Sequence, residues 1–212
     1  MTDRDYLTLA REGQSRYEEK KSVFLGFAAK LESEEDAARW LGSVKRAYPD
    51  ARHHVYAYRL REGNAARYSD DREPQGTAGM PILDVLRGKN LIDCGIVVVR
   101  YFGGTLLGTG GLVRAYSTSA SDAVKDAGIV RMTVRRRFTL TLSYADNPRV
   151  TQILSSRPGV LFDLSFGEGV TVSGTVDDDA ADALSLAVTD ATAGRAAPEW
   201  GDQIFAPVPV DN

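Results

Sequence analysis

The chain has 212 residues, of which 43% are hydrophobic and 26% charged, and its formal net charge is −3. This balance is typical of a globular protein with a hydrophobic core, and it excludes an intrinsically disordered chain. The longest apolar run covers residues 95–99, far fewer than the roughly 20 residues that a transmembrane helix needs. We therefore expect a soluble protein with no membrane partner.

The first residues and the cysteine content favour a cytoplasmic location. Residues 1–14 contain acidic side chains and no apolar stretch that resembles the hydrophobic part of a secretory signal. Cys94 is the only cysteine, so the chain forms no internal disulfide, as is usual in a reducing compartment. Because Cys94 leads into the longest apolar run, we interpret it as a buried structural thiol and give it no chemical role.

The first part of the chain begins with a predicted strand, helix and strand pair. Residues 22–31 have strand character, and Ser33 is a suitable N-cap for a helix that starts with three acidic residues. That helix ends before Pro49, because the residue before a proline avoids helical geometry. Residues 54–60 alternate as a strand, and residues 65–69 are expected to return as a short second strand.

A polar loop over residues 70–79 and a glycine-rich loop over residues 102–111 separate the next predicted elements. Pro81 suits the first turn of a helix that runs to about Arg87. Residues 94–101 form a predicted buried strand, which leads into the glycine-rich loop. A helix is expected from about residue 112 to residue 126.

The pattern changes near residues 130–137, and a chain of this length accommodates two small domains. We predict a first domain over residues 1–133 and a second over residues 134–212. The second contains strands at 135–144, 159–166, 170–176 and 197–205, with helices after 146–148 and from 177–179 to 193. This βαββαβ order is that of a ferredoxin-like domain, so the predicted class is α+β with two domains.

The polar loop 70–79 carries three carboxylates, those of Asp70, Asp71 and Glu73, and its neighbourhood adds the hydroxyls of Ser69 and Thr77. Carboxylate oxygens are the ligands that Mg²⁺ prefers, so one interpretation is a magnesium or acid–base site. Short acidic side chains also pair with arginines, accept hydrogen bonds from their own loop and cap the following helix. Closely spaced carboxylates alone do not decide between these interpretations.

The glycine-rich loop is a candidate anion-binding cleft. Its glycines permit positive φ angles and close approach of a ligand to the backbone. Free amides at the start of the following helix, with Arg100 or Arg114 nearby, suit a phosphate or carboxylate. The loop lacks the Gly-Lys-Ser/Thr of a Walker A motif, so nucleotide hydrolysis is unsupported. The candidate residues are Arg100, Tyr101, Gly103, Gly104, Gly108, Thr109, Gly110, Gly111 and Arg114.

A structural interpretation competes with each of these functional ones. The glycines also suit a tight crossing from strand to helix with close packing. Tyr101 belongs to a group of aromatic residues near basic ones, a mixture that either stacks on bases or packs in a core. His53 and His54 are the only histidines. Adjacent strand residues point to opposite faces, so the pair does not predict a zinc site, and no catalytic triad is visible.

Several segments together resemble the IMPACT/YigZ family. They are DARHH at 50–54, YSDD at 68–71, EP at 73–74, GTAG at 76–79, RYFGG at 100–104 and LGTGGLVRAY at 107–116. Position 72 is Arg, where many members of that family carry Gly. A tight turn that depends on Gly at this position is therefore not expected from the resemblance alone. The resemblance implies a first domain like a domain of a small-ribosomal-subunit protein and a ferredoxin-like C-terminal domain. Its eukaryotic members are regulators of translation.

We therefore expect a non-enzymatic binding or regulatory protein linked to translation, with no cofactor and no metal. Its partner is expected to be the ribosome, RNA or a translation-associated protein. The predicted site is the cleft between the two loops, where Arg52, His53, Arg100 and Arg114 contact anionic groups. The alternative is a Mg²⁺-dependent enzyme that acts on a phosphorylated or nucleotide-like small molecule through Asp70, Asp71 or Glu73.

Overall fold

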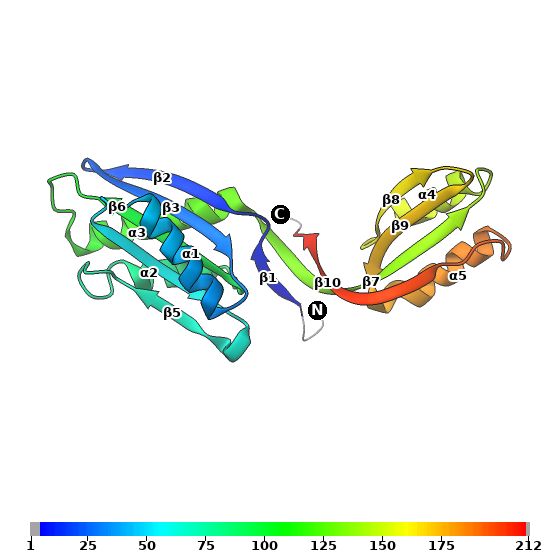
Figure 1. Ribbon diagram of the computed structural model, residues 1–212, viewed down its shortest axis with the longest axis horizontal. Helices are drawn as coiled ribbons and strands as arrows, with labels where there is room; N and C mark the ends of the chain where they lie inside the picture. Colours follow the sequence, from blue (N-terminus) through cyan, green and yellow to red (C-terminus); the bar gives the residue numbers. More distant parts are fainter. Residues whose placement is uncertain (1–4, 211–212) are drawn as a thin grey trace. The chain divides into compact units, whose positions relative to one another are not determined.

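The computed structural model describes residues 5–210, which divide into two compact units. One unit comprises residues 6–131 with Pro209 and Val210, and the other comprises Asp5 and residues 132–208. Both mix helices and strands, as Figure 1 shows, so the predicted α+β class with two domains is confirmed. Within the described residues, no helix combines the length and the hydrophobicity of a membrane span.

A five-stranded antiparallel sheet forms the centre of the unit 6–131. Its strands lie in the order β2-β3-β6-β4-β5. Their bounds are β2 Gly13–Glu19, β3 Ser22–Lys30, β6 Cys94–Tyr101, β4 His53–Arg59 and β5 Ala66–Ser69. The central strand β6 is buried along almost its whole length, as its apolar sequence predicts.

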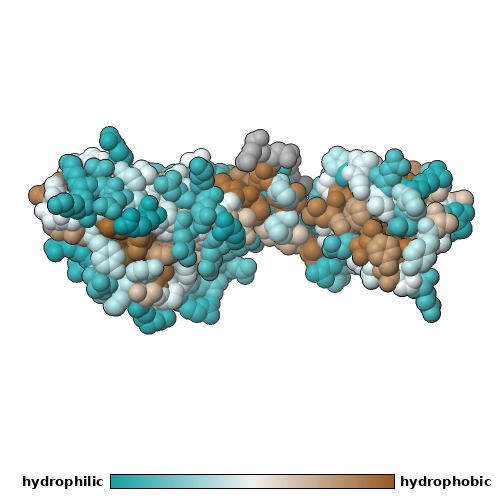
Figure 2. All heavy atoms as spheres, turned by 90° about the horizontal axis from the view of Figure 1, so that it is seen from above, coloured by the Kyte–Doolittle hydropathy of each residue, from teal (hydrophilic) through white to brown (hydrophobic). Residues whose placement is uncertain are grey.

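Helices cover both faces of this sheet. The side chains of Ile96 and Val98 pack in one core with helices α2 (Gly79–Gly88) and α3 (Gly108–Ala127). The alternate residues Val97 and Val99 pack with α1 (Glu34–Ala47). The period of two along β6 therefore divides the unit into three layers. Figure 2 shows mainly hydrophilic residues over the visible face of this unit.

Local predictions in this unit were partly correct. Ser33 caps α1, because its Oγ accepts a hydrogen bond of 3.1 Å from the Asp36 amide. The helix expected from residue 112 begins at Gly108 instead, so part of the predicted glycine-rich loop is helical. Strand β2 was not predicted, since its sequence GQSRYEE is mostly polar; in the structure its residues alternate between buried or half-buried and exposed.

The second unit has the βαββαβ order. Its elements are β7 Ile129–Leu142, α4 Asn147–Ser156, β8 Leu161–Phe166, β9 Val170–Asp177, α5 Ala181–Ala191 and β10 Glu199–Pro209. In its sheet β10 pairs with β7, and the path continues through β9 to β8. Strand β1 (Tyr6–Leu9) belongs to the first unit and is hydrogen-bonded to β7, whose first residues, 129–131, lie in that unit as well. Short 3₁₀ helices cover Glu62–Asn64 in the first unit and Asp178–Ala180 in this one. The inward residues of β7 and β9 pack against α4 and α5.

Candidate functional site

A row of three side chains crosses one end of the first sheet. Arg100 on β6 is the direct cross-strand partner of His53 on β4 and of Phe24 on β3. Arg100 has a relative exposure of 4% and His53 one of 7%. Tyr101, one residue further, packs in the opposite core beside α1 and donates a hydrogen bond to Asp50. Tyr101 therefore does not share the face of Arg100.

Glu73 is the centre of a buried polar network that joins this row to helix α3. Its Oε1 accepts hydrogen bonds from Arg100 Nη1 at 2.5 Å and from the Tyr116 hydroxyl at 2.8 Å. His53 Nε2 lies 3.7 Å from the same oxygen. Burial, and then the charge of Glu73, raise the pKa of Tyr116 above its ordinary value. Arg100 and Glu73 thus form a buried ion pair, and Arg100 is not a free cation.

The other polar residues of the loop 70–79 build the loop itself. Asp70 accepts hydrogen bonds from three backbone amides, at 2.9 Å from Gly76, 3.1 Å from Ala78 and 2.8 Å from Gly79. The Thr77 hydroxyl donates to the Pro74 carbonyl at 2.7 Å. These contacts correspond to the structural interpretation of the acidic loop, in which the acids satisfy the backbone that surrounds them.

Hydrogen bonds of Asp71 connect the start of the loop to strand β4. Its Oδ2 accepts from the His54 amide at 2.7 Å, and its carbonyl accepts from His53 Nδ1 at 2.7 Å. Its own amide donates to Ser69 Oγ at 3.2 Å. Across the part of the chain that the structure describes, no three or more His, Cys, Asp or Glu side chains are grouped so as to hold a metal ion.

The turn at Asp71 and Arg72 is left-handed although neither residue is a glycine. Their φ angles are 40° and 72°. Such angles are strained for residues with a Cβ, and the hydrogen bonds of Asp71 offset that cost. Arg72 also donates to the Arg52 carbonyl at 3.0 Å. Arg at position 72 therefore preserves the tight turn that the family resemblance left in question.

A cavity of about 440 Å³ opens above this network. One part of its wall is polar and mainly cationic, and the rest is apolar. Its polar lining residues are Arg52, His53, Arg72, Glu73, Arg100 and Thr109, and the others are Pro74, Phe102, Leu106, Leu107, Gly108 and Leu112. The two predicted loops do meet here, and Arg52, His53 and Arg100 line one cavity.

Helix α3 begins at the wall of this cavity. Its N-cap is Leu107, which supplies no side-chain hydrogen bond to the first turn. The first four amides of an α-helix have no partner within the helix, and the helix dipole makes that end partly positive. Gly108 and Thr109 lie in this turn and line the cavity. The residues predicted to bind an anion from Gly108 to Gly111 therefore lie at a helix terminus and not in a loop.

Arg114 lines a different, smaller cavity of about 290 Å³, which shares the lining residue Leu107 with the larger one. Its other lining residues are Tyr17, Glu19, Lys20, Gly110 and Gly111. The single cleft that the sequence predicted is therefore wrong in this respect. Residues at the start of α3 line both cavities, and Leu107 belongs to the lining of each.

Comparison with known proteins identifies the family. Residues 20–124 match the Impact N-terminal domain. IMPACT family member YvyE of Bacillus subtilis is 30% identical over 201 residues, which cover 94% of this chain and 93% of that relative. The chain belongs to the IMPACT family. IMPACT family member YigZ of Escherichia coli is 36% identical over 150 residues, 69% of this chain and 74% of that relative.

A solved structure also resembles this IMPACT-family chain through most of its length. It is described as the crystal structure of an hypothetical protein and is 31% identical. The match covers 92% of this chain and 96% of the other, with a TM-score of 0.59. The resemblance inferred from short sequence segments is thus confirmed, and their residues surround the network and the start of α3.

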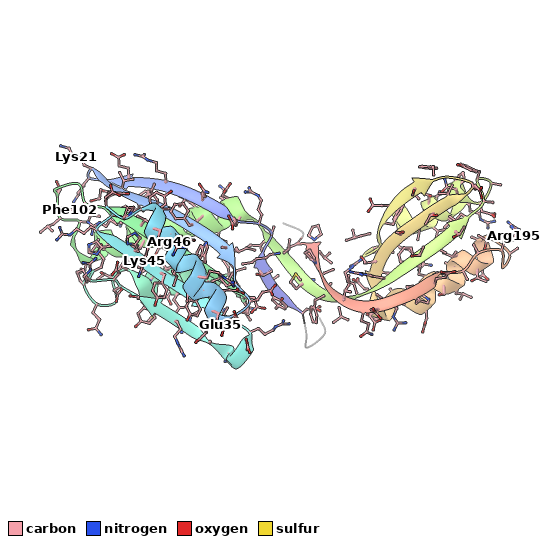
Figure 3. All side chains as sticks on the ribbon, in the orientation of Figure 1. Lys21, Glu35, Lys45, Arg46, Phe102 and Arg195 are labelled. Carbon is pink, nitrogen blue, oxygen red and sulfur yellow. The ribbon has the colours of Figure 1, made fainter. Side chains whose placement is uncertain are left out.

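The glycines of these segments have different roles in this IMPACT-family chain. A Cβ on Gly103 would collide with the backbone carbonyl carbon of Lys21, so Gly103 permits close packing of two backbones. Its amide donates to Ser22 Oγ at 3.1 Å. Gly104 and Gly108 have φ angles of 83° and 74°, which glycine adopts without strain. Figure 3 shows Lys21 and Phe102 at the same end of the unit.

Sequence reasoning named Phe102 among the aromatic residues near basic ones but missed the leucines that complete the apolar wall of the larger cavity. Phe102 has a relative exposure of 41% and Leu106 one of 82%. Two adjacent leucines, Leu106 and Leu107, within a glycine-rich segment were the signal that pointed to it. With the other apolar lining residues, these side chains give the larger cavity an exposed apolar wall.

Proposed function

We propose that this IMPACT-family protein is a non-enzymatic, cytoplasmic binding factor linked to translation. It binds phosphate groups of RNA, either in the ribosome or in free RNA, at the start of helix α3. The observation that carries the proposal is the position of this helix terminus between two hollows, each with its own basic side chain. Arg52 lines the larger hollow and Arg114 the smaller one. Free amides and arginines are the groups that proteins use for phosphates.

The charges around the helix terminus support an anionic ligand. Arg52 and Arg114 are exposed, and neither forms an ion pair with a carboxylate of the described residues. Lys20 and Lys21 form the turn between β2 and β3, and Lys20 lines the same hollow as Arg114. An extended polyanion such as RNA can reach both hollows, whereas a single phosphate occupies one.

The alternative of a Mg²⁺-dependent enzyme requires carboxylates that are available to a metal or a substrate proton. Asp70 and Asp71 accept hydrogen bonds from backbone amides, and Glu73 accepts them from Arg100 and Tyr116. The contacts of all three acids are those of structural residues. The geometry therefore favours binding over catalysis.

The test is sedimentation with ribosomes, together with titration of RNA, over a range of salt concentrations. The variant combines Arg52→Ala with Arg114→Ala, because Arg100 is needed for the buried pair. We expect weaker binding, and a slope of log affinity against log salt that falls by about 1 for each phosphate that the variant no longer neutralises.

The matched control combines Arg149→Ala with Arg157→Ala, which remove the same charge from the second unit. It should bind like the unaltered protein. Equal losses in both double variants would show that net charge alone drives binding. Failure of the unaltered protein to bind ribosomes or RNA at low salt would overturn the proposal.

A further inference from the structure

The larger cavity contains more than an anion site needs. Amides and arginines stabilise a bound phosphate group, but apolar side chains contribute nothing to its binding. Here Phe102, Leu106, Leu107 and Leu112 line the cavity together with Pro74. Leu106 is the most exposed of the large apolar residues in the described chain, at 82%. A phosphate-only site leaves this wall unexplained.

The ring of Phe102 is held in place by two guanidinium groups. The Cζ of Arg100 lies 5.5 Å from the ring centroid, and the Cζ of Arg52 lies 6.0 Å from it. Cations near an aromatic face stabilise its position without covering it completely. The ring keeps a relative exposure of 41%, so another flat group can reach it. An aromatic ring beside cations is the arrangement on which nucleic-acid bases stack.

One residue of the cavity lining, Arg100, has a buried hydrogen-bonding group without a partner among the described residues. Arg100 Nε is buried and has no hydrogen-bond partner among the described residues, although Nη1 and Nη2 bond to Glu73 and Ser22. The Arg100 side chain is 5% exposed and lines the cavity. Buried polar atoms without partners are uncommon in folded proteins. This unsatisfied N–H is independent of the helix terminus; because the atom has almost no exposed surface, a ligand in the cavity would reach it only after the Arg100 side chain moves.

From these features we infer that the cavity receives one unstacked nucleotide of a single-stranded RNA, with its base against Phe102 and Leu106 and its phosphate at the start of α3. The inference rests on the proposed function and specifies its ligand. The cavity of about 440 Å³ lies within the range usual for small-ligand sites, about 300–1,000 Å³. A base inside a duplex does not reach such a hollow, because its faces are covered by neighbouring bases.

The experiment measures fluorescence anisotropy with two labelled RNAs of about ten nucleotides. One has all its bases, and the other has the same backbone with abasic residues. We expect the complete RNA to bind about tenfold more tightly to the unaltered protein, since a stacked base contributes about 1–3 kcal/mol. Phe102→Ala should lower the affinity for the complete RNA much more than the affinity for the abasic RNA, and so remove this preference. Phe102→Trp should restore it.

The outcomes separate this inference from the proposed function. If both RNAs bind equally and Arg52→Ala weakens both, the anion site stands and the base site is wrong. If neither RNA binds at low salt, the proposed function fails. If a duplex of the same length binds as tightly as the complete single strand, the requirement for an unstacked base is wrong. A preference for bases that Phe102→Ala leaves intact would also overturn the inference.

Discussion

The two units differ in how each surrounds a buried arginine. In the second unit Arg135 is fully buried and uses every nitrogen. Its Nε donates to Thr175 Oγ1 at 2.9 Å, Nη1 to Asp177 at 2.7 Å, and Nη2 to the carbonyls of Thr175 and Gly159. In the first unit Arg100 leaves Nε without a partner among the described residues, beside a cavity. All the nitrogens of the Arg135 guanidinium are therefore satisfied within its unit, whereas Arg100, which lines a cavity, keeps one N–H without a partner among the described residues.

The partner acids differ as well. The Glu73 side chain is 4% exposed, and the Asp177 side chain is 42% exposed. Burial raises the pKa of Asp177, and the Arg135 guanidinium opposes that change. Because the Asp177 side chain is partly exposed, water still stabilises its charge in part, whereas the charge of Glu73 depends on Arg100 and Tyr116. The comparison predicts that the same chemical change in the two acids has unequal consequences.

The largest effect is expected from neutralising these acids. Glu73→Gln leaves the charge of Arg100 buried without compensation, which costs about 3–5 kcal/mol of the free energy of unfolding. Asp177→Asn should cost no more than about 1 kcal/mol, because Asp177 is solvated and the carbonyl partners of Arg135 remain. Trp40 lies in the first unit and Trp200 in the second, so tryptophan fluorescence during urea unfolding reports each unit.

The measurement uses the full chain in two backgrounds, Trp200→Phe to follow the first unit and Trp40→Phe to follow the second. Each background without a further change is its own control. Similar losses for Glu73→Gln and Asp177→Asn would contradict the distinction between the two arginines. A loss for Glu73→Gln that appears only in the Trp200 signal would contradict its assignment to the first unit.

A smaller loss of the free energy of unfolding is expected at alkaline pH, again in the first unit. Burial and then the Glu73 charge raise the pKa of Tyr116 from its ordinary value of 10.0. In the unfolded chain this phenol ionises near that value, whereas in the folded chain it stays protonated. The folded state therefore loses relative stability as the pH rises above about 10, and not below it. The Trp40 signal should show this loss in urea titrations between pH 9 and 11.

Tyr116→Phe is the matched variant for this effect. It removes the hydroxyl that donates to Glu73, at a cost of about 1 kcal/mol at neutral pH, and it should flatten the alkaline loss. Four other tyrosines in the same unit also have a pKa raised chiefly by burial: Tyr6, Tyr17, Tyr58 and Tyr101. Some loss should therefore persist. An unchanged alkaline profile in Tyr116→Phe would show that Tyr116 does not carry the effect.

Much of the fold followed from local sequence. The apolar run of β6, the Ser33 cap and the βαββαβ order of the second unit depend on periodicity and capping, which neighbouring residues determine. The start of α3 was misplaced by four residues, because Gly108, Gly110 and Gly111 are poor helix formers and tertiary packing overrides that preference. The polar strand β2 was missed because its sequence offers little apolar alternation.

The candidate site was predictable in its composition but not in its pairing. Glycines, acids and arginines marked the right segments. The contact between Arg100 and Glu73 joins residues 27 positions apart, and nothing local shows that one neutralises the other. Likewise, nothing local shows that Arg52 and Arg114 line two different cavities that share only Leu107. Such features depend on the three-dimensional packing of elements distant in sequence.

The smallest expected effect is on the chemical labelling of Cys94, which lies in the same core as residues of α2 and α3. Burial, and then the neighbouring Asp93, raise the pKa of this thiol to about 12. Since only the thiolate reacts, we expect negligible labelling by an aromatic disulfide reagent at pH 8 in the folded protein and rapid labelling in urea. Cys94→Ala gives the background, and Glu73→Gln should speed labelling by opening the unit more often. Rapid stoichiometric labelling of the folded, unaltered protein would show that this core is accessible.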